Sequence, residues 1–134
     1  MALKLKAAGL FVKDMAAMVA FYRDVVGFPL EWDGVDPSVI VEQEGLRFYL
    51  FGRNDFEELT NHKYTYPSGI NGTFELALDV DTPEEVDVEY DRMVRMGATP
   101  IIAPKTYPWG LRSSYIADPE GNLIEIATWK SPNA

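Results

Sequence analysis

Two glutamates, Glu75 and Glu125, are the first candidates for chemistry in this sequence. Glu75 lies in the run 74–80 and Glu125 in the run 122–129, and both runs alternate in the manner of half-buried strands. Successive side chains of a strand point to opposite faces, so each glutamate is expected on the face opposite the most apolar residues. Carboxylates on such an open face suit a cationic ligand, although ordinary solvent-facing glutamates would give the same pattern.

Other kinds of chemistry are poorly represented. The chain has one histidine and no cysteine, so it offers neither a pair of imidazoles for a metal nor a thiol nucleophile. It also lacks a glycine-rich phosphate loop and the Gly-x-Ser-x-Gly motif of hydrolases. The single histidine, His62, lies in a polar segment and is interpreted as an exposed loop residue. The sequence therefore predicts no catalytic residue.

The charge balance restricts the partners. A formal net charge of −9 argues against nucleic acid and favours a neutral or cationic ligand. The start of the chain does not resemble a signal peptide, and no apolar run approaches the roughly 20 residues of a membrane span. We expect a cytoplasmic protein without a membrane partner.

A weak internal repeat indicates which elements position the glutamates. Each half reads as a strand, a helix and three further strands. The helices are expected to begin after Asp14 and Thr82 and to end at Gly27 and Gly97. In the second half, the turn 118–121 joins two strands into a hairpin.

This repeat predicts an α+β protein with two tandem β-α-β-β-β modules. The first module spans 1–53, the linker spans 54–72, and the second module spans 73–134, all within one structural domain. If the open faces of the two modules form one cleft, the repeat places Ala7, Tyr49, Glu75 and Glu125 on its floor.

Three features of the sequence are similar to the vicinal oxygen chelate superfamily, which includes glyoxalases, bleomycin resistance proteins and extradiol dioxygenases. They are the two-module layout, the segment 21–28 (Phe-Tyr-Arg-Asp-Val-Val-Gly-Phe), and the Pro-Trp-Gly loop 108–110 followed by Asp-Pro-Glu-Gly-Asn-Leu-Ile-Glu at 118–125. The resemblance covers about residues 5–129. It implies two modules that pair their sheets into a curved cleft, with metal ligands on the first and last strand of each module.

The positions that carry metal ligands in that superfamily fall on Ala7, Tyr49, Glu75 and Glu125, and none of these is histidine. Glu75 and Glu125 alone would make a weak site for magnesium or calcium, and they are less suited to zinc, iron or nickel. We therefore expect no metal and no cofactor. The sequence is most similar to the metal-free, bleomycin-resistance-like branch.

The resemblance leads to one preferred function and two alternatives. The preferred function is a homodimeric protein that sequesters a cationic or aromatic small molecule without a metal. One alternative is a metal-dependent isomerase, lyase or dioxygenase-like enzyme that uses Glu75 and Glu125, and the other is a structural or regulatory domain with a vestigial cleft. The predicted ligand-binding residues are Glu75, Glu125, Tyr49, Trp109, Phe11 and Trp32.

Overall fold

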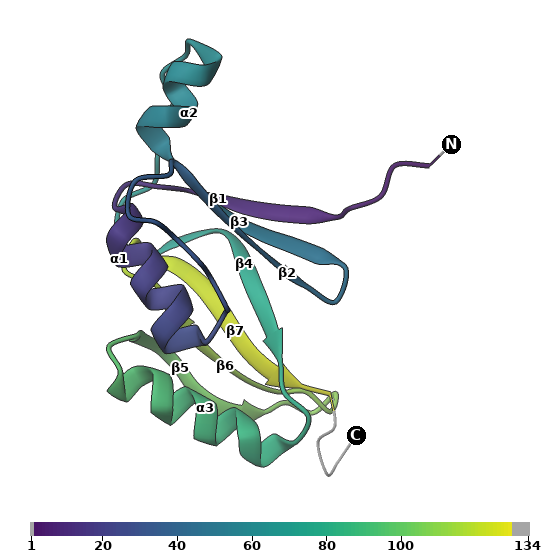
Figure 1. Cartoon of the computed structure of the whole chain (residues 1–134). Coiled ribbons are helices and arrows are strands. Elements are labelled where there is room, and N and C mark those ends of the chain that lie inside the picture. Colours follow the sequence, from purple (N-terminus) through teal and green to yellow (C-terminus); the bar gives the residue numbers. More distant parts are fainter. Residues whose placement is uncertain (1, 130–134) are drawn as a thin grey trace. The chain divides into compact units, whose positions relative to one another are not determined.

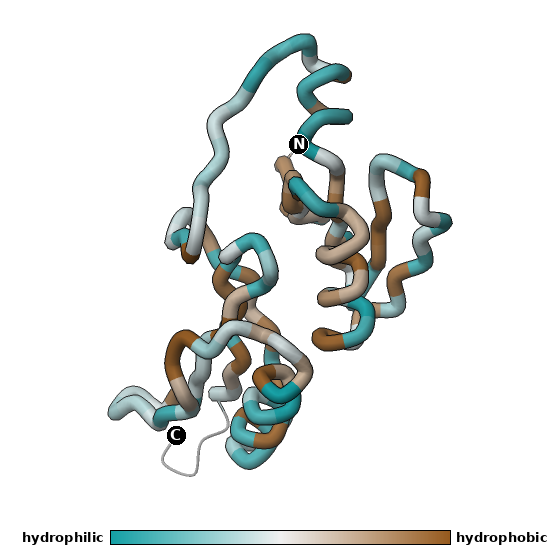
Figure 2. The backbone as a smooth tube through the Cα atoms, turned by 90° about the vertical axis from the view of Figure 1, so that its left-hand side faces the viewer, coloured by the Kyte–Doolittle hydropathy of each residue, from teal (hydrophilic) through white to brown (hydrophobic). Residues whose placement is uncertain are grey.

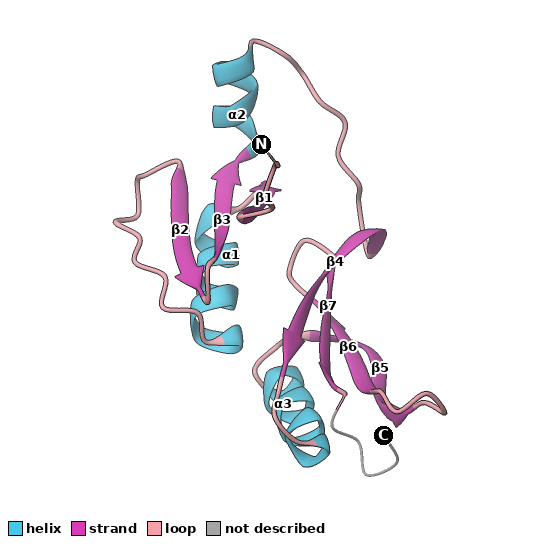
Figure 3. Ribbon diagram, turned by 90° about the vertical axis from the view of Figure 1, so that its right-hand side faces the viewer, coloured by secondary structure: helices cyan, strands magenta, loops and turns pink. Residues whose placement is uncertain are grey.

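The computed structural model describes residues 2–129, which divide into two compact units between Tyr66 and Pro67. Within the described residues, no helix is long and apolar enough to cross a membrane. The predicted α+β class is confirmed: one unit contains a three-stranded sheet and the other a four-stranded sheet, each with helices (Figures 1 and 3).

The first unit is built around the sheet order β1-β3-β2, in which β1 and β3 are parallel. Its elements are β1 (Ala7–Val12), α1 (Met15–Ala20), the π-helix η1 (Phe21–Val26), β2 (Ser38–Gln43), β3 (Leu46–Gly52) and α2 (Arg53–Thr60). The Asp14 carboxylate caps α1 by accepting a hydrogen bond from the Ala17 amide at 3.0 Å, as predicted. Met18, Val19 and Tyr22 then bury one side of this helical stretch in the core with Leu50.

The second unit has the sheet order β4-β7-β6-β5. Its elements are β4 (Asn71–Asp79), α3 (Pro83–Arg95), β5 (Thr99–Thr106), β6 (Arg112–Ala117) and β7 (Asn122–Thr128). The predicted start of α3 is confirmed, because the Thr82 hydroxyl accepts a hydrogen bond from the Glu85 amide at 3.3 Å. The Asp87 carboxylate of α3 then accepts hydrogen bonds from Nε and Nη2 of Arg112, at 2.8 and 2.7 Å, and fixes the helix on one face of the sheet.

Only two of the three strands predicted after the helix of the first half form among the described residues. Residues 28–37 contain Pro29 and Pro37 and turn at Asp33, whose carboxylate accepts hydrogen bonds from the Val35 and Asp36 amides at 2.8 and 2.7 Å. Backbone groups that a strand would pair with a neighbour are satisfied locally instead. The prolines also remove two ladder donors.

Most of α2 lies within the segment 54–72, which was predicted to link the two modules. This helix is mainly hydrophilic (the upper helix in Figure 2). The Glu57 side chain of α2 accepts hydrogen bonds from the Tyr64 amide at 3.1 Å and the Tyr66 hydroxyl at 2.9 Å, and it pairs with Lys63 at 3.3 Å. These contacts fold the following residues back against the helix.

The predicted turn 118–121 is confirmed as the link between β6 and β7. The Asp118 carboxylate accepts hydrogen bonds from the Glu120 and Asn122 amides at 2.9 and 3.0 Å, and Gly121 has a φ of +85°. Asn71, at the start of β4, donates from its backbone amide to the Gly121 carbonyl at 2.9 Å. The turn therefore fixes three strands at one end of the sheet.

Candidate functional site

The sheet of the second unit has one face against α3 and one open face. Arg112, Ile116, Ile124 and Ile126 share the α3 face, and the three isoleucines are fully buried. Alternation then places Glu75, Glu125 and Tyr115 together on the open face. The prediction that both glutamates lie opposite the apolar residues of their strands therefore agrees with the described geometry.

Two hydroxyl groups connect the glutamates to β6. The Tyr115 hydroxyl donates a hydrogen bond to Glu75 Oε1 at 3.1 Å, and the Ser113 hydroxyl donates to Glu125 Oε2 at 2.7 Å. Ser113 is buried, whereas Glu75 is exposed and Glu125 is half-buried. We call Glu75, Tyr115, Glu125 and Ser113 the carboxylate cluster.

Electrostatics within the carboxylate cluster disfavour a second negative charge. Burial, followed by repulsion from Glu125, raises the pKa of Glu75, although the hydrogen bond from Tyr115 acts in the opposite direction. Burial and the two neighbouring carboxylates also raise the pKa of Tyr115, so its hydroxyl stays protonated and remains a donor. A cation placed beside both glutamates would relieve this repulsion.

Trp109 lies outside the core of the second unit. Its side chain is 62% exposed in the loop between β5 and β6, and its ring stacks on Tyr107 with centroids 4.8 Å apart. The Lys105 ammonium lies 5.1 Å from the Tyr107 ring centroid. The loop therefore presents an aromatic surface to solvent.

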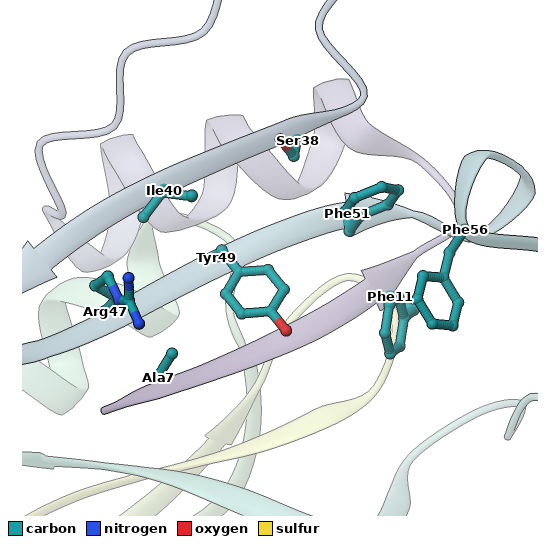
Figure 4. A pocket seen from close by; sticks show the side chains of 8 residues that line it. All are labelled: Ala7, Phe11, Ser38, Ile40, Arg47, Tyr49, Phe51 and Phe56. Atoms are coloured by element: carbon teal, nitrogen blue, oxygen red, sulfur yellow. The ribbon is translucent and has the colours of Figure 1, made fainter. Parts of the chain in front are cut away.

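In the first unit, the open face of the sheet is aromatic. A hollow of about 470 Å³ contains three of the positions predicted from the sequence (Figure 4). Its lining is Ala7, Phe11, Ser38, Ile40, Arg47, Tyr49, Phe51 and Phe56. We call these residues the aromatic hollow.

Tyr49 lies across a glycine on the neighbouring strand. Gly9 pairs with Tyr49 in the register of β1 and β3, and a Cβ atom at Gly9 would collide with the tyrosine ring. Any other residue at position 9 would force the ring to move. Gly9 was not among the predicted site residues, yet it sets where Tyr49 lies.

Trp32 and His62 lie outside both the carboxylate cluster and the aromatic hollow. The Trp32 indole donates to the Asp36 carbonyl at 2.8 Å and borders a separate hollow of about 150 Å³. His62 lies beside Tyr64, with ring centroids 4.6 Å apart, and is exposed as predicted. The role of Trp32 in ligand binding stays a prediction.

Several site residues were missed by sequence reasoning. Arg47 and Phe51 follow the same alternation as Tyr49, so that signal was present in the sequence. Phe56 gave no such signal, because it belongs to α2 rather than to a strand. The predicted hairpin already placed Ser113 on the strand next to that of Glu125, whereas the contact of Tyr115 with Glu75 also needs the pairing of β4 with β7, which the sequence did not specify.

The donor set does not fit a transition metal. Among the described residues, no group of three or more histidines, cysteines, aspartates or glutamates could hold a metal ion. Ala7 and Tyr49 supply a methyl group and a phenol, and Glu75 and Glu125 each accept a hydrogen bond from a protein hydroxyl. Zinc, iron and nickel sites in proteins use imidazole or thiolate ligands, which are missing from these four positions.

Comparisons with known proteins identify one family and one curated relative. A family model described as the Glyoxalase/Bleomycin resistance protein/Dioxygenase superfamily matches residues 4–126. The uncharacterized protein YraH of Bacillus subtilis (strain 168) is 28% identical over 127 residues, which cover 92% of this chain and 97% of YraH.

Solved structures with similar folds include members of the same superfamily. A glyoxalase/bleomycin resistance protein/dioxygenase family enzyme from Burkholderia phytofirmans PsJN is 28% identical, with a TM-score of 0.78 over 93% of this chain and 98% of that one. A glyoxalase-related enzyme from Fulvimarina pelagi has a TM-score of 0.80 at 22% identity, covers 94% and 88% of the two chains, and shares the fold.

Proposed function

This chain belongs to the glyoxalase/bleomycin resistance protein/dioxygenase superfamily, and we propose on that premise that it sequesters a cationic, aromatic small molecule without using a metal. The carboxylate cluster is the observation that carries the proposal. Glu75 and Glu125 share one open sheet face, and a carboxylate has acceptor lone pairs beyond the one that each uses for the hydroxyl of Tyr115 or Ser113. A bound cation would satisfy these acceptors and offset the repulsion between the two charges.

Aromatic side chains supply the remaining contacts in this proposal. Trp109 offers an exposed ring in the second unit, and Phe11 and Tyr49 offer rings in the first unit. A cation over such a ring gains about 0.5–2 kcal/mol, according to how far it is desolvated. That all of these residues, with Trp32, bind one ligand stays a prediction.

Titration with bleomycin, a cationic glycopeptide with an aromatic tail, tests the proposal. Isothermal calorimetry at low salt is expected to give a dissociation constant in the micromolar range or tighter. Raising the salt from 0.1 to 1 M shortens the Debye length from about 10 Å to about 3 Å, so the affinity should fall strongly. Sucrose at matched osmolality should have little effect. Binding no tighter than millimolar at low salt would refute the proposal.

An enzyme of the same superfamily is the second candidate, and the raised pKa of Glu75 favours it. A carboxylate acts more effectively as a general base when its pKa lies closer to the working pH. Recovery of the bound ligand distinguishes the two candidates. Sequestration returns it chemically unchanged, as NMR would show, whereas an isomerase or lyase converts it.

We further propose that the protein is a homodimer. Each unit leaves two sheet edges without a strand partner among the described residues, β1 and β2 in the first unit and β4 and β5 in the second. Exposed apolar side chains lie on these edges, including Ile40 at 58% and Ile102 at 42% exposure.

Light scattering coupled to gel filtration tests this assembly. At micromolar concentration we expect twice the 15.1 kDa mass of the chain. The measured mass should remain twice that of the chain at 0.5 M salt, because the expected interface is apolar. A mass near 15.1 kDa would contradict the proposal.

A further inference from the structure

We propose that the aromatic hollow of the first unit binds an aromatic carboxylate about two rings long, with Arg47 holding the anionic group. The inference rests on the proposed function in one respect, that the open faces bind small molecules. It differs in the charge of the bound group, which is negative at Arg47 and positive at the carboxylate cluster.

Arg47 is the only charged residue among the eight that line the aromatic hollow. Its guanidinium makes no hydrogen bond or ion pair with any residue that the structure describes, although Glu42 lies opposite it in the register of β2 and β3. The lining contains no carboxylate. An exposed guanidinium beside apolar rings is suited to a planar carboxylate, which it can bind through two parallel hydrogen bonds.

Three phenylalanines form the opposite end of the hollow (Figure 4). The Phe11 and Phe56 ring centroids are 4.2 Å apart, and Phe51 lies 6.4 Å from Phe11 and 5.9 Å from Phe56. The Arg53 side chain ties α2 to β1 by donating to the Phe11 carbonyl at 3.1 Å, so Phe56 is held in place. The rings therefore form a preorganised apolar wall.

The distance along β3 determines the length of the ligand. Arg47 and Phe51 are four residues apart on one strand face, which corresponds to about 13 Å between their Cα atoms. Tyr49 lies between them (Figure 4). The long Arg47 side chain shortens the gap that a ligand must span. A carboxylate on two linked rings could reach the phenylalanines from Arg47, whereas benzoate would be too short to do so.

Two biphenyl probes that differ in charge test this inference. Biphenyl-4-carboxylate is expected to bind at least tenfold more tightly than biphenyl-4-carboxamide. Arg47→Gln should abolish the preference for the carboxylate, because it should weaken that probe more than the neutral carboxamide. Arg95→Gln, which removes the same charge from the exposed end of α3, is the matched control and should retain the preference.

A further variant identifies the hollow, and titration with bleomycin separates the two proposals. Phe56→Leu should weaken the carboxylate and carboxamide probes by a similar factor. A preference for carboxylate in a protein that fails to bind bleomycin would support this inference while refuting the cation proposal. Equal affinity for carboxylate and carboxamide, or a preference that survives Arg47→Gln, would each overturn the inference.

Discussion

Glu75→Gln is expected to lower the affinity for bleomycin tenfold or more. The substitution keeps the size of the side chain and an acceptor for the Tyr115 hydroxyl, but it removes the charge. A charge-assisted contact of this kind contributes on the order of 1.5–3 kcal/mol, and 1.4 kcal/mol corresponds to a factor of ten. Isothermal calorimetry at low salt measures the change. Asp91→Asn, on the exposed side of α3, is the control and should leave the affinity unchanged.

The same variant should not weaken the fold at neutral pH. The pKa of Glu75 is raised in the folded protein, so its protonated form favours folding. That contribution is fully present below the unfolded pKa and is lost as the pH rises through the folded pKa. Glutamine resembles the protonated form at every pH, so thermal unfolding at pH 7 should show no loss of stability.

Acid should reduce cation binding, because protonation removes the negative charge of Glu75. As the pH falls, Glu75 gains a proton at a higher pH than an ordinary glutamate, whose pKa is about 4.5. The wild-type affinity should therefore decline early on acidification, and Glu75→Gln should remove that part of the decline. If Glu75→Gln and Glu125→Gln both leave the affinity unchanged, the ligand binds elsewhere and the site assignment is wrong.

Gly121→Ala is expected to destabilise the protein by roughly 2–4 kcal/mol. Gly121 has a φ of +85°, a region that residues with a Cβ seldom adopt. A Cβ at this position would also collide with the backbone carbonyl of Gly69, which has no flexible side chain that could move aside. The free energy of unfolding in urea measures the loss, which should appear as a lower midpoint.

Two other glycines separate the causes of this effect. Gly45, in the turn between β2 and β3, has a φ of +84°, but no atom lies within 4 Å of the place that a Cβ would take. Gly45→Ala should therefore cost only the conformational part, about 1–2 kcal/mol. Gly72 has neither a positive φ nor a close neighbour, and Gly72→Ala should change stability little. If Gly121→Ala is no more destabilising than Gly45→Ala, the collision with Gly69 is not significant.

Local signals accounted for most of what the sequence could predict. The Asp14 and Thr82 caps and the turn at Gly121 depend on a few adjacent residues, and all three form as predicted. The shared face of Glu75 and Glu125 follows from alternation within two strands. None of these features requires knowledge of which strands pair.

Features that depend on pairing or on competing local bonds were harder to predict. Tyr115 reaches Glu75 across an intervening strand, because β6 and β4 both pair with β7. One of the three strands expected after the first helix is missing from the described residues, because within 28–37 the Asp33 carboxylate accepts hydrogen bonds from backbone amides that a neighbouring strand would otherwise bind. Phe56 enters the aromatic hollow from a helix in what was predicted to be the linker.

The pairing of β4 with β7 also has a consequence for the order of folding. The contact between Asn71 and Gly121 joins residues 50 positions apart, whereas Ser113 and Glu125 are 12 apart in a hairpin. Closing the longer loop costs more chain entropy, by about 0.6 kcal/mol for each doubling of length. The hairpin can therefore assemble first, and β4 adds to it later and can detach from it sooner. Each detachment would remove Glu75 from Tyr115 while Glu125 stays bonded to Ser113, so cation affinity would be lost before the unit unfolds.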